Sequence, residues 1–257
     1  MKNLRDFTMA RVSLGRTGDA LPCRELLDLR RAHAAARDAV HERLDVVSLR
    51  MECEQRGWDT VAVRSNASDR AQYLRRPDLG RLPDSAAKQA LTPGSFDAVI
   101  VIADGLSALA VQRHAVAVLD RLLPKLREGE WNLAPLVLVE QGRVAIADTL
   151  AQWLKAKLSV ILIGERPGLT SPDSLGAYLT WDPSPGRTDA QRNCISNIRP
   201  EGLDYDPAAA RIFTLMTEMR RKQLSGISLN LFSQPWYWST PCFKSFPADI
   251  YIPFGNR

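Results

Sequence analysis

The residues LSVILIGERPG occupy positions 158–168, and they decide the fold. The apolar run Leu158–Ile163 ends at Gly164, and a glutamate, an arginine and a proline follow it. An apolar run of this length between turn-forming residues is typical of a buried strand that leads into a rigid loop. In open α/β sheets, ligands bind beyond the carboxyl ends of the strands. Glu165 therefore stands where a carboxylate can contact a ligand.

Strands and helices alternate upstream of this run. Apolar strands are predicted over 97–103 and 133–140, and helical periods follow them over 107–123 and 146–156. Pro124 is expected to stop the first of these helices. The alternation predicts right-handed crossovers and parallel strands that are covered on both faces. The expected fold class is therefore α/β, with a Rossmann-like, doubly wound, mostly parallel sheet flanked by helices.

A helical N-terminal element is predicted before the sheet. Apolar residues recur at helical spacing over 23–44, and His33 falls on the same stripe. A histidine in such a stripe is expected to be a packed core residue rather than a ligand. A short strand is predicted over 60–64, and a basic loop over 73–81.

The end of the chain has a different composition. Eight of the eighteen aromatic residues fall within 231–257, together with four prolines. This segment either wraps onto the body, binds a partner or comes from an altered reading frame, because a dense exposed aromatic surface is sticky. We divide the chain into a helical N-terminal element with a basic loop (1–90), a Rossmann-like domain (91–229) and this tail (230–257).

Charge and cysteine usage narrow the class of protein. The net charge of +5 is most simply explained by a solvated, arginine-rich surface. A partner with acidic patches is the second interpretation. Nucleic acid is the third, because no nucleic-acid-binding motif is found. The four cysteines lack the spacing of a zinc site. The polar start and the lack of any apolar stretch near about 18 residues predict neither a signal peptide nor a membrane helix. Free thiols in a reducing cytosol are expected.

Seven segments spread over the chain carry a family resemblance. They are ARVSLGRTGD (10–19), YLRRPDLGR (73–81), VIADGLSALAV (101–111), QGRVAIAD (141–148), GERPGL (164–169), SPDSLGAYLTW (171–181) and RTDAQRNCISNIRPEG (187–202). Together they closely resemble the small (light) subunit of adenosylcobalamin-dependent ethanolamine ammonia-lyase. The match extends over about 10–229.

The resemblance implies an activity and a partner. Enzymes of this family convert ethanolamine into acetaldehyde and ammonia by a radical mechanism that uses adenosylcobalamin. The large subunit mainly holds the ethanolamine, while the small subunit covers the cofactor at the interface between them. The resemblance also implies a cytoplasmic hetero-oligomer, with a bacterial microcompartment as a further location. Neither nucleic acid nor a membrane is implied as a partner.

The resemblance also implies three cofactor-binding residues: Val144, Glu165 and Cys194. It implies no catalytic residue and no metal ligand in this chain. Taken alone, Val144 reads as a core residue, Glu165 as an ion-pair partner of Arg166, and Cys194 as a buried structural thiol. The segment 193–197 around Cys194 reads as polar and turn-rich.

Two further expectations concern the kind of cofactor site. None of the three histidines, His33, His41 and His114, stands in an Asp-x-His-x-x-Gly loop. Cobalamin is therefore expected to keep its own benzimidazole on the cobalt (base-on), as in the resembling family. The alternative is a stand-alone Rossmann-like enzyme that binds a nucleotide or metabolite. That alternative calls for a glycine-rich phosphate loop, which the sequence lacks.

Overall fold

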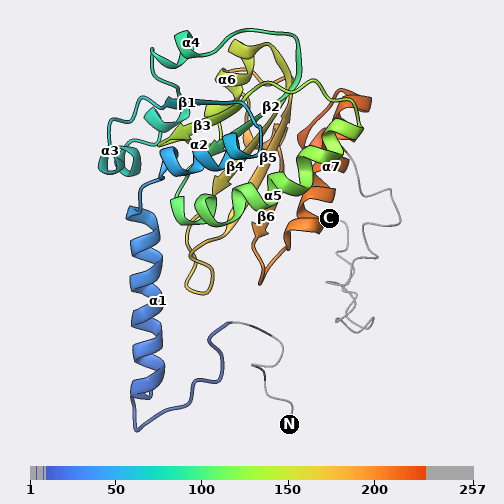
Figure 1. Ribbon diagram of the computed structural model, residues 1–257. Coiled ribbons are helices and arrows are strands. Elements are labelled where there is room, and N and C mark those ends of the chain that lie inside the picture. Colours follow the sequence, from blue (N-terminus) through green and yellow to red (C-terminus); the bar gives the residue numbers. More distant parts are fainter. Residues whose placement is uncertain (1–3, 5–7, 9, 230–257) are drawn as a thin grey trace, which may run out of the picture.

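The computed structural model describes residues 4, 8 and 10–229, and the tail predicted over 230–257 lies outside them. The described residues form a mixed α/β fold with helices on both faces of one sheet (Figure 1). No helix in this part of the chain is long and apolar enough to cross a membrane.

A six-stranded sheet forms the centre of the fold. In their order across the sheet, its strands are β1 (Thr60–Arg64), β3 (Leu136–Glu140), β2 (Phe96–Ala103), β4 (Ala156–Gly164), β5 (Leu175–Trp181) and β6 (Asn193–Ile198). The first four run parallel, whereas β5 and β6 are antiparallel to their neighbours. From β2 the chain winds to one side through β3 and to the other side through β4.

The described chain contains seven α-helices. They are α1 (Cys23–His41), α2 (Val46–Gln55), α3 (Arg70–Arg75), α4 (Ala87–Ala90), α5 (Ala108–Glu128), α6 (Ile146–Leu154) and α7 (Tyr205–Lys222). The helices α2, α5 and α7 pack in one hydrophobic core, and α4 and α6 pack in a second. In β2, Ile100 and Ile102 enter the first core, and Val99 and Val101 enter the second. Burial on both faces explains why these strands are continuous apolar runs.

The α/β class and the mostly parallel sheet are confirmed. The strands predicted over 60–64, 97–103, 133–140 and 158–163 correspond to β1, β2, β3 and β4. Parallel pairing of β2 with both β3 and β4 follows from the intervening helices, which carry the chain back to the starting edge.

The predicted end of the helix after β2 is wrong. The helix α5 continues through Pro124 to Glu128, where Gly129 follows. Proline removes one backbone donor, but Leu126 in the last turn is fully buried. Packing of this turn against the core outweighs the lost hydrogen bond.

The prediction that His33 is a packed core residue is also wrong. The helix α1 extends away from the body (Figure 1), and Ala39 is its one buried residue. His33 is exposed, and Leu27 is 63% exposed. The helical period is correct, but the apolar stripe faces no core within the described chain.

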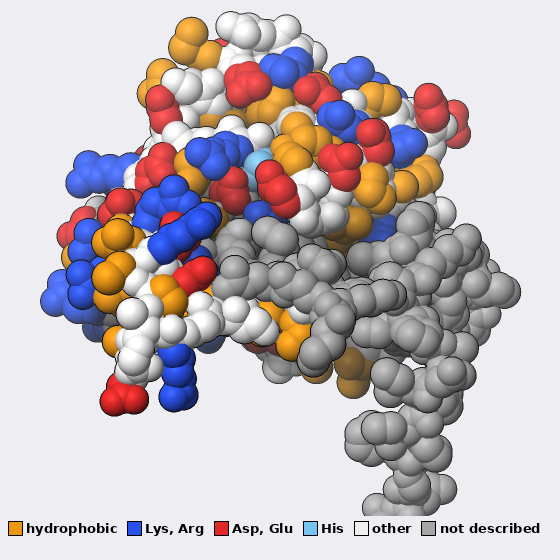
Figure 2. All heavy atoms as spheres, turned by 90° about the horizontal axis from the view of Figure 1, so that it is seen from below, with side chains coloured by type: hydrophobic (Ala, Val, Ile, Leu, Met, Phe, Trp, Pro, Cys, Tyr) orange, Lys and Arg blue, Asp and Glu red, His pale blue; other side chains and the backbone are white. Residues whose placement is uncertain are grey.

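The charged surface is mixed in sign. Figure 2 shows Lys and Arg side chains interspersed with Asp and Glu over the described part of one face. Many of these charges form exposed pairs, such as Arg50 with Glu54 at 2.7 Å and Arg76 with Asp78 at 2.7 Å. Such pairs each contribute about 0–1 kcal/mol. This pattern supports the first interpretation of the net charge, a solvated arginine-rich surface.

The prediction of a turn-rich segment over 193–197 is wrong, because these residues form the edge strand β6. Arg192, the residue directly before this strand, forms a buried ion pair with Asp148 of α6. Two hydrogen bonds of 2.7 and 2.6 Å join them, and their side chains are 3% and 1% exposed. Thr180 of β5 accepts a further bond from Arg192 at 3.0 Å.

We expect Asp148→Ala to lower the free energy of unfolding by about 3–5 kcal/mol, because it leaves the Arg192 guanidinium buried without its counter-charge. Urea unfolding followed by circular dichroism measures this loss. The matched control is Glu54→Ala, which removes a 49% exposed partner of Arg50 on the helix α2 and should cost less than about 1 kcal/mol. Similar losses in the two variants would contradict the prediction.

Candidate functional site

The loops after β2, β3 and β4 meet at the carboxyl edge of the sheet. The turn after β2 is pressed against the end of β4, where Leu106 N donates to Gly164 O over 2.9 Å. Gly105 has a φ of 57°, and a Cβ at this position would lie 2.2 Å from Gly164 O. A glycine is therefore required for this close approach.

A buried carboxylate joins two of these loops. Asp104 is 1% exposed, and its two oxygens accept hydrogen bonds from Gln141 N and Gly142 N, both at 3.0 Å. Arg70 of α3 lies 3.4 Å from the same carboxylate and donates to Gly105 O over 2.8 Å. Burial raises the pKa of Asp104 to about 6, although Arg70 and the backbone donors act in the opposite direction.

Glu165 lies immediately after β4 and is held by three donors. Its carboxylate accepts from Ser174 Oγ at 2.5 Å, Ser196 Oγ at 2.6 Å and Asn197 N at 3.2 Å. Gly176 on β5 leaves the space, because a Cβ there would lie 2.8 Å from Glu165 Oε1. The simpler interpretation of Glu165 was an ion pair with Arg166. Within the described residues, these two side chains form no ion pair. The carboxylate is fixed by neutral donors instead.

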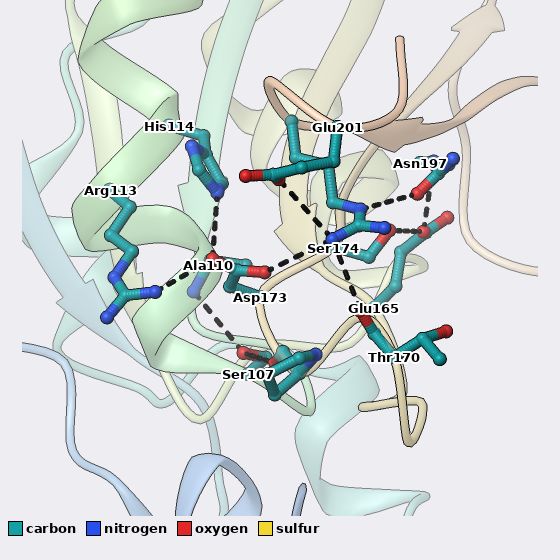
Figure 3. Close-up of polar contacts among 12 residues, drawn as sticks. Ser107, Ala110, Arg113, His114, Glu165, Thr170, Asp173, Ser174, Asn197 and Glu201 are labelled. Carbon is teal, nitrogen blue, oxygen red and sulfur yellow. Dashed lines mark hydrogen bonds and ion pairs between the residues drawn. The ribbon is translucent and has the colours of Figure 1, made fainter. Parts of the chain in front are cut away.

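A polar network supports the loop that carries Glu165 (Figure 3). Arg199 Nε donates to Asn197 Oδ1 over 3.0 Å, and its Nη1 lies 4.0 Å from Asp173 Oδ1. Asp173 Oδ2 accepts from Arg113 Nη1 of α5 over 2.8 Å. These contacts link α5, the loop after β4 and the end of β6. The position of Glu165 is therefore determined by three elements.

An open cavity of about 450 Å³, which we name the edge cavity, lies among these loops. Its lining combines the apolar side chains of Leu106, Val144 and Ile163, the aromatic rings of Tyr73 and Tyr178, and the charged side chains of Arg143, Glu165 and Arg166. Burial raises the pKa of both tyrosines, so they remain neutral hydroxyls at pH 7. The cavity thus offers apolar contact area, one carboxylate acceptor and two cations.

The structure brings Val144 and Glu165 to this same cavity. Val144 is half-buried and packs against the second core, so the core interpretation is correct for only part of its surface. Cys194 is exposed, and its interpretation as a buried structural thiol is therefore wrong. Its cross-strand partner is Tyr178, which lines the edge cavity. Val144 and Glu165 therefore line one cavity, whereas Cys194 does not line it and neighbours Tyr178 of its wall.

Two tyrosines of the site were missed by sequence reasoning. Tyr73 lies in the segment 73–81 that was interpreted as a loop, but it belongs to α3 and is 0% exposed. Its hydroxyl donates to Gly142 O over 3.1 Å. Tyr178 lies on β5, where Ala177 and Leu179 enter the first core and Tyr178 packs against the second, and the period-two alternation of a strand is the signal that could have found it.

Fold and cavity together define a mixed α/β protein of the class that binds ligands at the carboxyl edge of a parallel sheet. A family model described as Ethanolamine ammonia-lyase light chain matches residues 1–230. Proteins named ethanolamine ammonia-lyase small subunit from Pseudomonas aeruginosa, Pseudomonas paraeruginosa and Pseudomonas fluorescens are 56, 55 and 54% identical over 232 residues. These alignments cover 88% of this chain and 85% of each relative.

The chain therefore belongs to the ethanolamine ammonia-lyase small (light) subunit family. The resemblance of its sequence motifs to this family is confirmed. The names of the relatives identify a lyase in which this chain has the place of a subunit.

The raised pKa of Asp104 makes stability depend on pH. Its folded-state pKa of about 6 exceeds the ordinary value of 3.8, so folding binds a proton between these values. This contribution to stability is present below about pH 4 and is lost as the pH rises through about 6. Relative to Asp104→Asn, the wild-type free energy of unfolding should fall by on the order of 3 kcal/mol across this window.

Urea unfolding at several pH values between about 4 and 7 measures this difference. Asp182→Asn changes an exposed carboxylate and should follow the wild-type pH dependence. If the curve of Asp104→Asn also runs parallel to that of the wild type, burial does not control the charge of Asp104.

Proposed function

We propose that this chain is the small subunit of an adenosylcobalamin-dependent ethanolamine ammonia-lyase and that its edge cavity holds one side of the cobalamin. Family membership makes the cofactor the expected ligand. The observation that carries the proposal is the position of Val144 and Glu165 on one cavity, with Cys194 beside its wall. When bound, adenosylcobalamin supplies the radical that starts the conversion of ethanolamine into acetaldehyde and ammonia.

The chemistry of the edge cavity fits this cofactor. Cobalamin presents a broad, flat corrin rimmed with amide groups, so its site needs apolar contact and a few placed acceptors. Val144, Leu106 and Tyr178 offer the apolar contact. An ionised carboxylate has about four acceptor sites, and Glu165 uses three of them within the chain. The remaining site is available to an amide N–H or a ribose hydroxyl of the cofactor.

The proposal divides the work between two subunits. This chain binds and orients the cobalamin, while the large subunit covers its other side and holds most of the ethanolamine. The rigid support of Glu165 by the Arg199–Asp173–Arg113 network fits a positioning role. We assign no catalytic residue to this chain, and we propose that the cobalamin remains base-on. The small subunit alone is then catalytically silent.

The same proposal includes expectations about domain division, location and partners. Strands β2 to β6 and their helices act as a Rossmann-like cofactor domain over 91–229, and the preceding element over 1–90 adds β1 to the same sheet. The complex resides in the cytoplasm, with a bacterial microcompartment as a further location. Its partners are the large subunit and a small molecule, and neither nucleic acid nor a membrane is among them.

Glu165→Ala should weaken adenosylcobalamin binding by about tenfold to hundredfold, because a hydrogen bond to a charged group contributes about 1.5–3 kcal/mol. The dissociation constant is measured by absorption titration of the co-expressed complex with the large subunit. Glu165→Gln keeps one acceptor oxygen and should lose less.

The matched control is Glu128→Ala. This exposed carboxylate ends α5, whose first turn starts at the carboxyl edge, and it therefore lies at the opposite edge of the sheet. It should leave the dissociation constant unchanged. If the Glu165→Ala complex assembles and binds the cofactor as tightly as the wild type, the proposed role of Glu165 is wrong.

Truncation after Leu229 should leave the complex active. The family match ends at residue 230, and Leu229 itself is 5% exposed, so the described core is retained. An acetaldehyde assay and size-exclusion chromatography of the truncated and full-length complexes test this expectation. Failure of the truncated chain to assemble would show that the aromatic tail is needed for the enzyme.

A further inference from the structure

The two oxygens of the Glu165 carboxylate differ in how many donors they hold. Within the described chain, Oε2 accepts hydrogen bonds from Ser174 Oγ at 2.5 Å and Asn197 N at 3.2 Å, whereas Oε1 accepts one from Ser196 Oγ at 2.6 Å. Figure 3 shows Ser174 and Asn197 next to Glu165. A carboxylate oxygen has about two acceptor sites. Oε2 is therefore fully used, and the acceptor site that Glu165 can offer to the edge cavity belongs to Oε1.

The bond from Asn197 depends on a backbone conformation that few residues adopt. Asn197 lies next to the end of β6, and its φ of 58° is in the left-handed region. This region is unfavourable for residues with a Cβ, although asparagine enters it more readily than most. In this conformation the Asn197 N–H reaches Glu165 Oε2. Surrounding contacts must therefore hold the conformation in place.

The turn over 199–203 supplies these contacts. Leu203 N donates to Asn197 O over 2.8 Å, and Gly202 lies so close that a Cβ there would be 2.4 Å from the same oxygen. The Asn197 side chain is held separately, because its Oδ1 accepts from Arg199 Nε over 3.0 Å. The backbone and the side chain of Asn197 are thus both fixed by this turn.

Arg199 also contacts the loop that carries the second donor to Oε2. Its Nη1 lies 3.4 Å from Thr170 O and 4.0 Å from Asp173 Oδ1, and Asp173 directly precedes Ser174. The Arg199 side chain is 11% exposed, and Glu201 at 3.5 Å also balances its charge. One packed guanidinium therefore connects the two segments that supply both donors of Oε2.

Resting on the proposed function, we propose that Arg199 is a positioning residue for the cofactor. By joining Asn197 to the loop over 170–174, it keeps Oε2 turned into the chain and Oε1 turned toward the edge cavity. Arg199 does not line this cavity, so it acts through Glu165. The planar fork of arginine suits this task, because it donates from separate nitrogens in a fixed geometry. A hydrogen bond weakens steeply as its angle departs from linearity, so a turned carboxylate binds the ligand less tightly.

The alternative role of Arg199 is to stabilise the fold through its ion pairs with Asp173 and Glu201. The two roles predict different results when Glu165 is removed. A residue that only stabilises the fold has the same effect whether or not Glu165 is present. A positioning residue loses its effect once there is no carboxylate to position. A double-mutant cycle measures this difference directly.

The cycle uses the complex with the large subunit and the dissociation constant of adenosylcobalamin, measured by absorption titration. With Glu165 present, Arg199→Ala should raise the dissociation constant about fivefold to tenfold, because the ligand loses part of a charge-assisted hydrogen bond. In the Glu165→Ala background, the same substitution should raise it less than about twofold. Circular dichroism and size-exclusion chromatography verify that each variant complex is folded and assembled.

If Arg199→Ala does not fold, Arg199→Lys takes its place in the cycle. Lysine keeps the positive charge beside Asp173 but lacks the fork that donates to Asn197 and Thr170 from separate nitrogens. It should raise the dissociation constant about threefold to tenfold with Glu165 present, and less than about twofold in the Glu165→Ala background.

Arg220→Ala is the matched control. Like Arg199, Arg220 contacts a carboxylate and a backbone carbonyl, which are Asp97 Oδ2 at 3.4 Å and Gly129 O at 3.5 Å. Arg220 lies in the last turn of α7, and Asp97 stands at the start of β2, so this contact is at the edge of the sheet opposite the cavity. The substitution should leave the dissociation constant within about twofold of the wild type.

The outcomes separate this inference from the proposed function. If Arg199→Ala weakens binding equally in the two Glu165 backgrounds, or in neither, Arg199 does not position Glu165, although the proposed cobalamin site stands. If Glu165→Ala alone leaves binding unchanged, the role of Glu165 and this inference are both wrong. A wild-type complex that does not bind adenosylcobalamin would contradict the proposed function itself.

Discussion

The buried carboxylate of Asp104 is the contact on which the carboxyl edge depends. It joins the turn after β2 to the loop after β3, and Arg70 brings α3 to the same point. The adjoining Gly105 lets that turn rest on the end of β4. A buried charge is costly unless several donors satisfy it, so these loops must keep one arrangement. Arg143, Val144 and Glu165 come together around the edge cavity formed by these loops.

The site combines an open cavity with polar groups that are held firmly in place. Its polar groups are fixed by neighbours within the chain, as the three donors to Glu165 and the network through Asp173 demonstrate. Its cavity is open, and the exposed Arg166 is part of the lining. Preorganised side chains at an open edge fit the proposed role of orienting a large ligand.

Sequence reasoning predicted the parallel strands well and the edges of the fold poorly. Burial on both faces of β2, β3 and β4 requires continuous apolar runs, and such runs are visible in the sequence. β6 was missed because an edge strand with one exposed face carries polar residues such as Asn193 and Ser196. The helix end at Pro124 was predicted wrongly because packing of the last turn against the core carries the helix further. His33 was predicted wrongly because the stripe on which it lies packs against no core within the described chain.

The sequence by itself determined the alternation of strands and helices, the loop that carries Glu165 and, through its long motifs, the family. These features depend on local periodicity and on residue identity. Only the tertiary structure decided that Tyr178 stands beside Cys194, that Tyr73 is buried next to Arg143, and that Val144 and Glu165 line one cavity. Strand register and crossovers set such contacts between residues far apart in the chain, and no short stretch of sequence specifies them.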